Sequence, residues 1–85
     1  MNVRVKLFAL ARDRAGAAEV ALELASGATV AAAADALGEK LPALRTMLPR
    51  VAFAVNREYA AADATLREGD ELAVIPPVSG GRGEG

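Results

Sequence analysis

The side chains that this chain lacks limit its chemistry. Its 85 residues include no cysteine and no histidine, which excludes a disulfide scaffold, a thiol or imidazole nucleophile and a histidine general base. The carboxylates are scattered, and Glu68, Asp70 and Glu71 are typical of a solvated turn rather than of a metal site. Ser79 has no histidine partner. We therefore expect a binding or carrier module without a bound metal or cofactor, rather than a self-sufficient enzyme.

The C-terminal segment holds the other residues with chemical potential. Its sequence is Pro76-Pro77-Val78-Ser79-Gly80-Gly81-Arg82-Gly83-Glu84-Gly85. Gly80 and Gly81 do not form a phosphate-binding loop, because no helix or strand follows them. Prolines favour an extended backbone, and glycines without an apolar anchor favour mobility. Residues 77–85 are therefore predicted to be a flexible C-terminal tail.

Composition and charge narrow the class of protein further. Ten basic and eleven acidic residues give a formal net charge of −1, which is too balanced for a nucleic-acid-binding surface. No apolar run approaches the ~20 residues of a membrane span, and the charged start at residues 1–6 lacks the apolar region of a signal peptide. We expect one small cytoplasmic domain, with no nucleic-acid or membrane partner.

Two alternating segments near the start predict an antiparallel pair of strands. In residues 2–8 apolar side chains alternate with charged ones, and Phe8 falls on the charged face. Residues 18–24 alternate in the same way. The segment 9–14 between them is predicted to be a short helical turn or loop. So short a connection is typical of a hairpin.

A change to helical periodicity follows Thr29, which is predicted to be the N-cap of the main helix. One helical face carries apolar residues at the spacing of successive turns: Val30, Ala33, Ala34, Leu37 and Leu41. Pro42 limits this helix, and one more turn is expected before Pro49.

Two more strands are predicted in the second half. Residues 51–55 form an almost unbroken apolar run, typical of a central strand covered on both faces. Residues 57–67 are predicted to be irregular, anchored by Tyr59 and Leu66. A turn then leads into the last strand, residues 71–75.

The resulting order of elements predicts an α+β fold. Four strands and one main helix in the order β-β-α-β-β favour a β-grasp (ubiquitin-like) roll, in which the helix packs across a mixed sheet. We expect this domain to cover residues 1–76.

Phe8 and Ile75 are apolar residues that the strand pattern predicts on the outward face of the sheet. The first and last strands of a β-grasp sheet are neighbours, so the two side chains could share one exposed patch. Such a patch with a charged rim commonly marks a docking surface. The alternative is a small cluster covered by residues 9–16 or by the tail, and the pattern alone favours neither.

An ordered set of motifs from Val3 to Gly81 resembles the small subunit of molybdopterin synthase, a ubiquitin-like sulfur carrier. The set comprises Val3-Arg4-Val5-Lys6-Leu7-Phe8-Ala9 with Arg12 and Gly16, Thr29-Val30, Ala54-Val55-Asn56, Leu66-Arg67-Glu68-Gly69-Asp70-Glu71, and Pro76-Pro77-Val78-Ser79-Gly80-Gly81 after the last strand. Its most specific part is the combination of Gly-Asp-Glu, a strand and Pro-Pro-Val-Ser-Gly-Gly.

The resemblance implies that the carboxylate of Gly81, presented with Gly80, is the reactive group. A partner adenylating enzyme of the E1 type would activate it with ATP and Mg²⁺, and sulfur would then replace the adenylate to give a thiocarboxylate. The large subunit of molybdopterin synthase, in a heterotetramer, would use that sulfur to convert cyclic pyranopterin monophosphate into the molybdopterin dithiolene. The partner-binding residues that the resemblance implies are Phe8, Arg12, Ile75, Pro76, Pro77 and Val78.

The four residues after Gly81 depart from the family's pattern. The Gly81 carbonyl is in a peptide bond to Arg82, so it has no carboxylate that could attack ATP. We therefore expect a precursor, from which a processing peptidase removes residues 82–85. The alternative is that Gly85 is the working terminus.

Three other functions fit the same features. Similar carriers deliver sulfur to thiazole, to thiolated tRNA or to cysteine synthesis, although the ending at Gly81 favours the molybdopterin branch. A ubiquitin-like modifier would be conjugated through its glycine to lysines of target proteins. A β-grasp interaction domain with an inert glycine tail is the third alternative.

Overall fold

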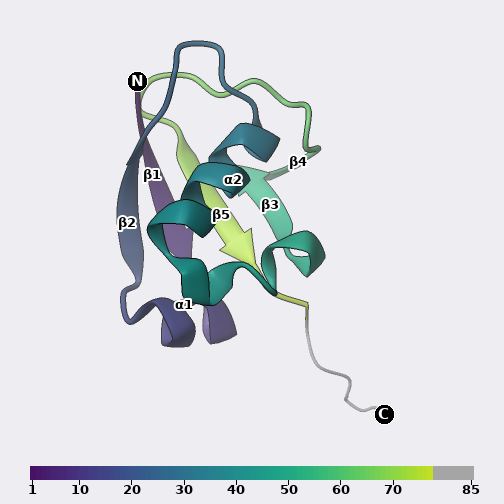
Figure 1. The fold of residues 1–85 in the computed structure, drawn as a ribbon. Coiled ribbons are helices and arrows are strands. Elements are labelled where there is room, and N and C mark those ends of the chain that lie inside the picture. The colour runs from purple at the N-terminus through teal and green to yellow at the C-terminus, as the bar shows by residue number, and fades with distance from the viewer. Residues whose placement is uncertain (78–85) are drawn as a thin grey trace.

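A five-stranded mixed sheet with the main helix packed across it forms the core of the protein (Figure 1). The computed structural model describes residues 1–77. Its elements are β1 (Asn2–Leu7), α1 (Ala9–Ala15), β2 (Glu19–Glu23), α2 (Val30–Lys40), the 3-10 turns η1 (Pro42–Leu44) and η2 (Leu48–Arg50), β3 (Ala52–Val55), β4 (Glu58–Ala60) and β5 (Glu71–Ile75). The strand order is β2-β1-β5-β3-β4. β1 and β5 are parallel, and the other neighbours are antiparallel. The predicted β-grasp roll is confirmed.

The connection between β1 and β2 contains a short helix, as the sequence predicted. α1 ends at Gly16, whose φ of 72° lies in the left-handed region that favours glycine. The Gly16 N–H donates to the carbonyl of Arg12 at 2.9 Å. Because β1 and β5 are parallel, α1 begins at the end of the sheet where β5 stops. Met1 lies at the opposite end (Figure 1).

The main helix α2 begins where the sequence predicted. The Thr29 side chain accepts a hydrogen bond from the Ala32 N–H at 3.2 Å, which satisfies one of the free donors of the first turn. A side chain at Gly38 would place its Cβ 3.4 Å from the side chains of Arg45 and Leu48. The missing side chain therefore lets η1 and η2 fold closely against the helix.

The core lies between α2 and the sheet. Its buried residues are Val3, Val5, Leu7, Ala11, Leu22, Val30, Ala33, Leu37, Leu44, Met47, Leu66, Leu72 and Val74. Within residues 1–77 no polar or charged residue is buried. None of the helices in this part of the chain is long and apolar enough to cross a membrane.

Two sequence predictions about the second half are wrong. The segment predicted to be irregular contains the strand β4, and Tyr59 on that strand is 78% exposed rather than an anchor. Leu66 is buried, as predicted. β3 is an interior strand between β5 and β4, as predicted, but it is not covered on both faces, because Ala52 is exposed.

Several motif residues hold the sheet together at the end opposite the tail. The Asn56 side chain donates to Asp70 Oδ1 at 3.0 Å and accepts from the Glu71 N–H at 3.0 Å. Asp70 Oδ2 accepts from the Arg67 N–H at 2.8 Å. Asn56 and Arg57 both have positive φ, of 50° and 72°, as in the two-residue turns that match strand twist. These motif residues therefore have a structural role.

Candidate functional site

The sheet face opposite α2 carries the residues predicted for docking, in rows set by the strand register. Ala52 pairs with Ile75, and Leu7 pairs with Val74, so Phe8 lies one step further on, beside Ile75. The next row contains Lys6, Ala73, Ala54 and Tyr59. The side of this face that lies over β5, β3 and β4 is therefore mainly apolar.

Phe8 and Ile75 come together at the end of the sheet, as the sequence predicted. Phe8 is 46% exposed and Ile75 is half-buried. Residues 9–16 therefore do not cover Phe8. Tyr59, at 78% exposure, is a third large side chain on the same face. We name Phe8, Ile75 and Tyr59, with the alanines between them, the docking face.

A backbone conformation unusual for alanine follows Phe8. Ala9 has a φ of 50°, a left-handed conformation that costs a residue with a Cβ about 1–2 kcal/mol. The residues on either side of it, Phe8 and Leu10, are 46% and 48% exposed. The sharp turn at Ala9 thus presents two apolar side chains beside the end of β5. The sequence analysis did not select Leu10. Ala11 is buried, and its neighbour Leu10 lies on the outer side of α1.

A groove surrounds the point where the chain leaves β5. Its volume is about 310 Å³, and we name it the tail-root groove; it is lined by Leu10, Arg14, Thr46, Met47, Arg50, Pro76 and Pro77. The Arg14 Nη1 group donates to Thr46 Oγ1 at 3.2 Å, which ties α1 to the segment between η1 and η2. Pro76 is half-buried and Pro77 is exposed. The two prolines therefore begin the tail against folded structure.

Arg12 is not among the residues that line this groove. It is exposed in the last turn of α1. Arg14 and Arg50, which sequence reasoning did not select, line the groove instead. Val78, Gly80, Gly81 and the extension 82–85 lie outside the described residues.

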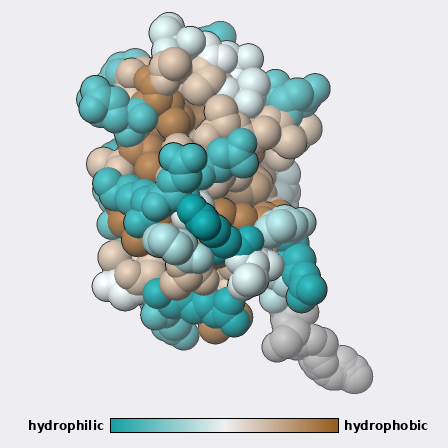
Figure 2. Space-filling view, in the orientation of Figure 1, coloured by the Kyte–Doolittle hydropathy of each residue, from teal (hydrophilic) through white to brown (hydrophobic). Residues whose placement is uncertain are grey.

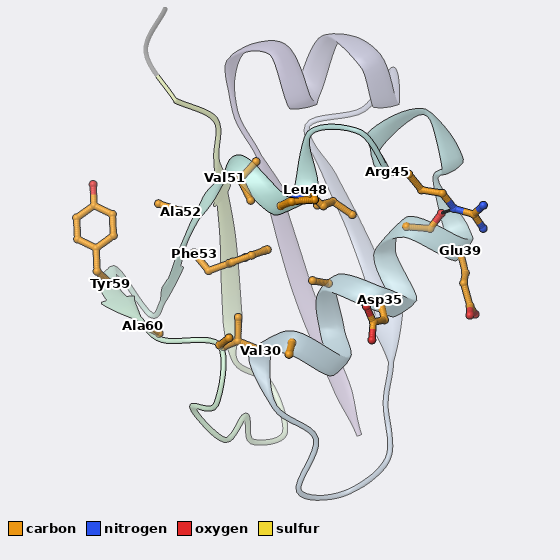
Figure 3. Close-up of a pocket in the computed structure, with 15 residues that line it drawn as sticks. Val30, Asp35, Glu39, Arg45, Leu48, Val51, Ala52, Phe53, Tyr59 and Ala60 are labelled. Carbon is orange, nitrogen blue, oxygen red and sulfur yellow. Dashed lines mark hydrogen bonds between the residues drawn. The ribbon is translucent and has the colours of Figure 1, made fainter.

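A wider groove, of about 900 Å³, runs between α2 and the β3–β4 side of the sheet (Figure 3). Phe53 points into it from β3, whereas Tyr59 points away from α2. Asp35 and Glu39 stand on its helical wall and are exposed. Figure 2 shows hydrophilic side chains between hydrophobic areas on the face that carries α2. In residues 1–77 no three acidic side chains come together as metal ligands would. The charged residues in its lining are Asp35, Glu39 and Arg45.

The comparison with protein families decides the relationship. The chain matches the model of the ThiS family over residues 5–81, which includes the predicted glycine pair. The chain belongs to the ThiS family. This ThiS-family chain is 40% identical over 81 residues to a molybdopterin synthase sulfur carrier subunit from Arabidopsis thaliana, a match that covers 95% of this chain and 84% of the relative.

Two further proteins are similar to this ThiS-family chain. The small archaeal modifier protein 1 of Haloferax volcanii is 38% identical over 84 residues, which cover 89% of this chain and 97% of the relative. Its crystal structure has a TM-score of 0.89 at 36% identity, covering 95% of this chain and all (100%) of that one. A chain in the complex of subunits 1 and 2 of molybdopterin-converting factor from Helicobacter pylori has a TM-score of 0.69 at 22% identity, covering 95% and 100%. That last likeness shows the fold alone.

Proposed function

We propose that this chain is the sulfur-carrier subunit of a molybdopterin synthase. The family match reaches residue 81, and this observation carries the proposal. It is supported by relatives of that name. The docking face supports it too, because it adjoins the end of the strand from which the tail departs.

The reactive group in this proposal is the carboxylate of Gly81. Its oxygen attacks the α-phosphorus of ATP, held with Mg²⁺ in an adenylating and sulfurating E1-like enzyme, and pyrophosphate leaves. A sulfur nucleophile from that enzyme system then displaces AMP, which leaves a thiocarboxylate. The chain has no cysteine, so the sulfur is carried on its terminus. The chain itself supplies no catalytic side chain.

The acceptor reaction takes place on a partner. The large subunit receives the tail, and two sulfur transfers to cyclic pyranopterin monophosphate form the dithiolene in a heterotetramer. The docking face supplies the contact, with Phe8 and Ile75 next to the tail root. Glycines are slim enough for a narrow channel, and the prolines lower the entropy that the tail loses on insertion. Arg12, which is exposed in the last turn of α1, supplies a rim charge in this proposal.

The encoded chain is a precursor in this proposal. Residues 82–85 block the Gly81 carboxylate by a peptide bond, and a processing peptidase removes them. The competing possibility is that Gly85 carries the sulfur.

The test compares the full chain with a form that ends at Gly81. Each is incubated with the adenylating enzyme, ATP, Mg²⁺ and a sulfur donor, and the intact mass is measured. We expect the sulfur-for-oxygen increase only on the form that ends at Gly81, and molybdopterin once the large subunit and the pterin precursor are added. A thiocarboxylate on Gly85 of the full chain would overturn the precursor role. Failure of both forms to accept adenylate would contradict the carrier function.

A second candidate function is protein modification, favoured by the similarity to small archaeal modifier protein 1. Both functions begin with adenylation of the terminal glycine, so sulfur loading does not separate them. Isopeptide-linked adducts that depend on Gly81 would support modification. A carrier for thiazole, tRNA or cysteine synthesis would instead be isolated with a different acceptor enzyme than the large subunit.

A further inference from the structure

The tail-root groove is positively charged. Two of its lining residues, Arg14 and Arg50, are cationic, and none is acidic. Both arginines are exposed. Within residues 1–77 the salt bridge formed joins Lys6 to Glu19 and involves neither arginine. No carboxylate of the described residues therefore neutralises the two guanidinium groups.

The Arg14 guanidinium makes one side-chain hydrogen bond and still has donors to offer. One Nη1 hydrogen is used in the 3.2 Å bond to Thr46 Oγ1. A guanidinium has five N–H donors in a planar fork that matches a carboxylate. Leu10, which is 48% exposed, and Met47 add apolar surface to the same groove. The groove therefore combines positive charge with an apolar wall.

We propose that the tail-root groove docks a carboxylate-bearing segment of the protein that receives the tail, with an apolar residue next to its Asp or Glu. Arg14 and Arg50 bind the carboxylate, and Leu10 contacts the apolar side chain. The identity of that partner, the large subunit, rests on the proposed function. The groove then fixes the direction in which the tail leaves the domain, because Pro76 and Pro77 are part of it.

A phosphate of the acyl-adenylate is a less suitable occupant. Gly81 is four residues beyond Pro77, and four extended residues reach about 14 Å. A tail inserted into a partner's site therefore carries its adenylate away from Arg14 and Arg50. The apolar wall also suits a peptide better than an inorganic anion, because an inorganic anion would leave Leu10 without a contact.

The test measures binding to the molybdopterin synthase large subunit of the same organism at several salt concentrations. The variants are Arg14→Glu, Arg50→Glu, the double variant, and the neutral pair Arg14→Gln and Arg50→Gln. Arg67→Glu is the matched control, because Arg67 is exposed, lies at the opposite end of the sheet and uses only its backbone in the turn. The full chain and the form ending at Gly81 are both used, and thermal melts check that each variant is folded.

We expect each charge reversal to raise Kd about tenfold at low salt and to flatten the salt dependence, with smaller effects for glutamine. Arg67→Glu should change Kd less than about twofold. If the unaltered chain binds but the double variant has the same Kd and salt dependence, this inference is wrong and the proposed function stands. If the unaltered chain does not bind in either form, the proposed partner itself is wrong.

A second measurement distinguishes a partner's carboxylate from a phosphate as the group that binds in the tail-root groove. The isotope-labelled chain is titrated with sodium phosphate at constant ionic strength, and backbone amide NMR signals are followed. We expect no saturable shifts at Arg14, Thr46 or Arg50. Saturable shifts confined to these residues would overturn the proposal in favour of a phosphate site.

Discussion

Phe8→Asp is expected to separate partner binding from folding. Phe8, directly after β1, is 46% exposed, whereas Val5 on β1 faces the core and is fully buried at 0%. Because about half of the Phe8 side chain is buried, its removal loses about half of the free energy of full burial, which is roughly 1–1.5 kcal/mol. A domain of this size has a free energy of unfolding of about 5 kcal/mol. Phe8→Asp should therefore remain folded, with a Tm about 4–10 °C lower.

Val5→Asp is the matched control for a buried position. It removes about 2 kcal/mol of apolar burial and places a carboxylate without a hydrogen-bond partner in the core, which costs several kcal/mol more. The sum exceeds the stability of the domain, so this variant should be unfolded by circular dichroism.

Binding of Phe8→Asp and of Ile75→Asp to the large subunit is measured by calorimetry. Phe8→Asp should raise Kd at least about a hundredfold, since large apolar side chains at the centre of an interface carry most of its energy. Ile75→Asp should act in the same direction. Loss of the fold by Phe8→Asp to the same extent as by Val5→Asp would refute the assignment of Phe8 to the docking face.

Three more predictions concern single side chains. Thr29→Ala removes the cap of α2 and should lower stability by about 1 kcal/mol, measured by urea unfolding; no change would mean that water replaces the cap. Asp70→Ala removes acceptors for Asn56 and Arg67 and should cost about 1–3 kcal/mol, while sulfur loading of the folded protein is unchanged. Arg12→Ala should slow association with the large subunit and reduce its salt dependence at nearly constant Tm; identical kinetics across the salt series would indicate an ordinary solvated arginine.

The parts of the fold that were predictable are those that local sequence determines. Alternation in β1 and β2 and the cap at Thr29 each depend on neighbouring residues. The strand β4 was missed because its three residues form a strand only through pairing with β3, and no local pattern records that pairing. β3 was predicted to be covered on both faces because its apolar run does not reveal that Ala52 is exposed on the outer face.

The candidate site also contains residues that local sequence predicts and residues that only tertiary packing brings together. Phe8 and Ile75 were predictable, because each is an apolar residue at an outward position of an alternating segment. Arg14 and Arg50 were not, because they belong to segments far apart in the sequence that meet only when α1 and η2 pack beside β5. Tyr59 was noticed as apolar, but its exposure follows from a register that the sequence does not contain.

The central position of β5 determines how the domain responds to a force on its C-terminus. β5 is hydrogen-bonded to β1 on one side and to β3 on the other. A pull along β5 loads both ladders in shear, because their hydrogen bonds lie across the strand direction, and many bonds must break together. A partner can therefore draw on this end of the chain without peeling the sheet apart. An unfoldase that engages β2, one of the two edge strands, should therefore unfold the protein more easily than one that pulls on its C-terminal end.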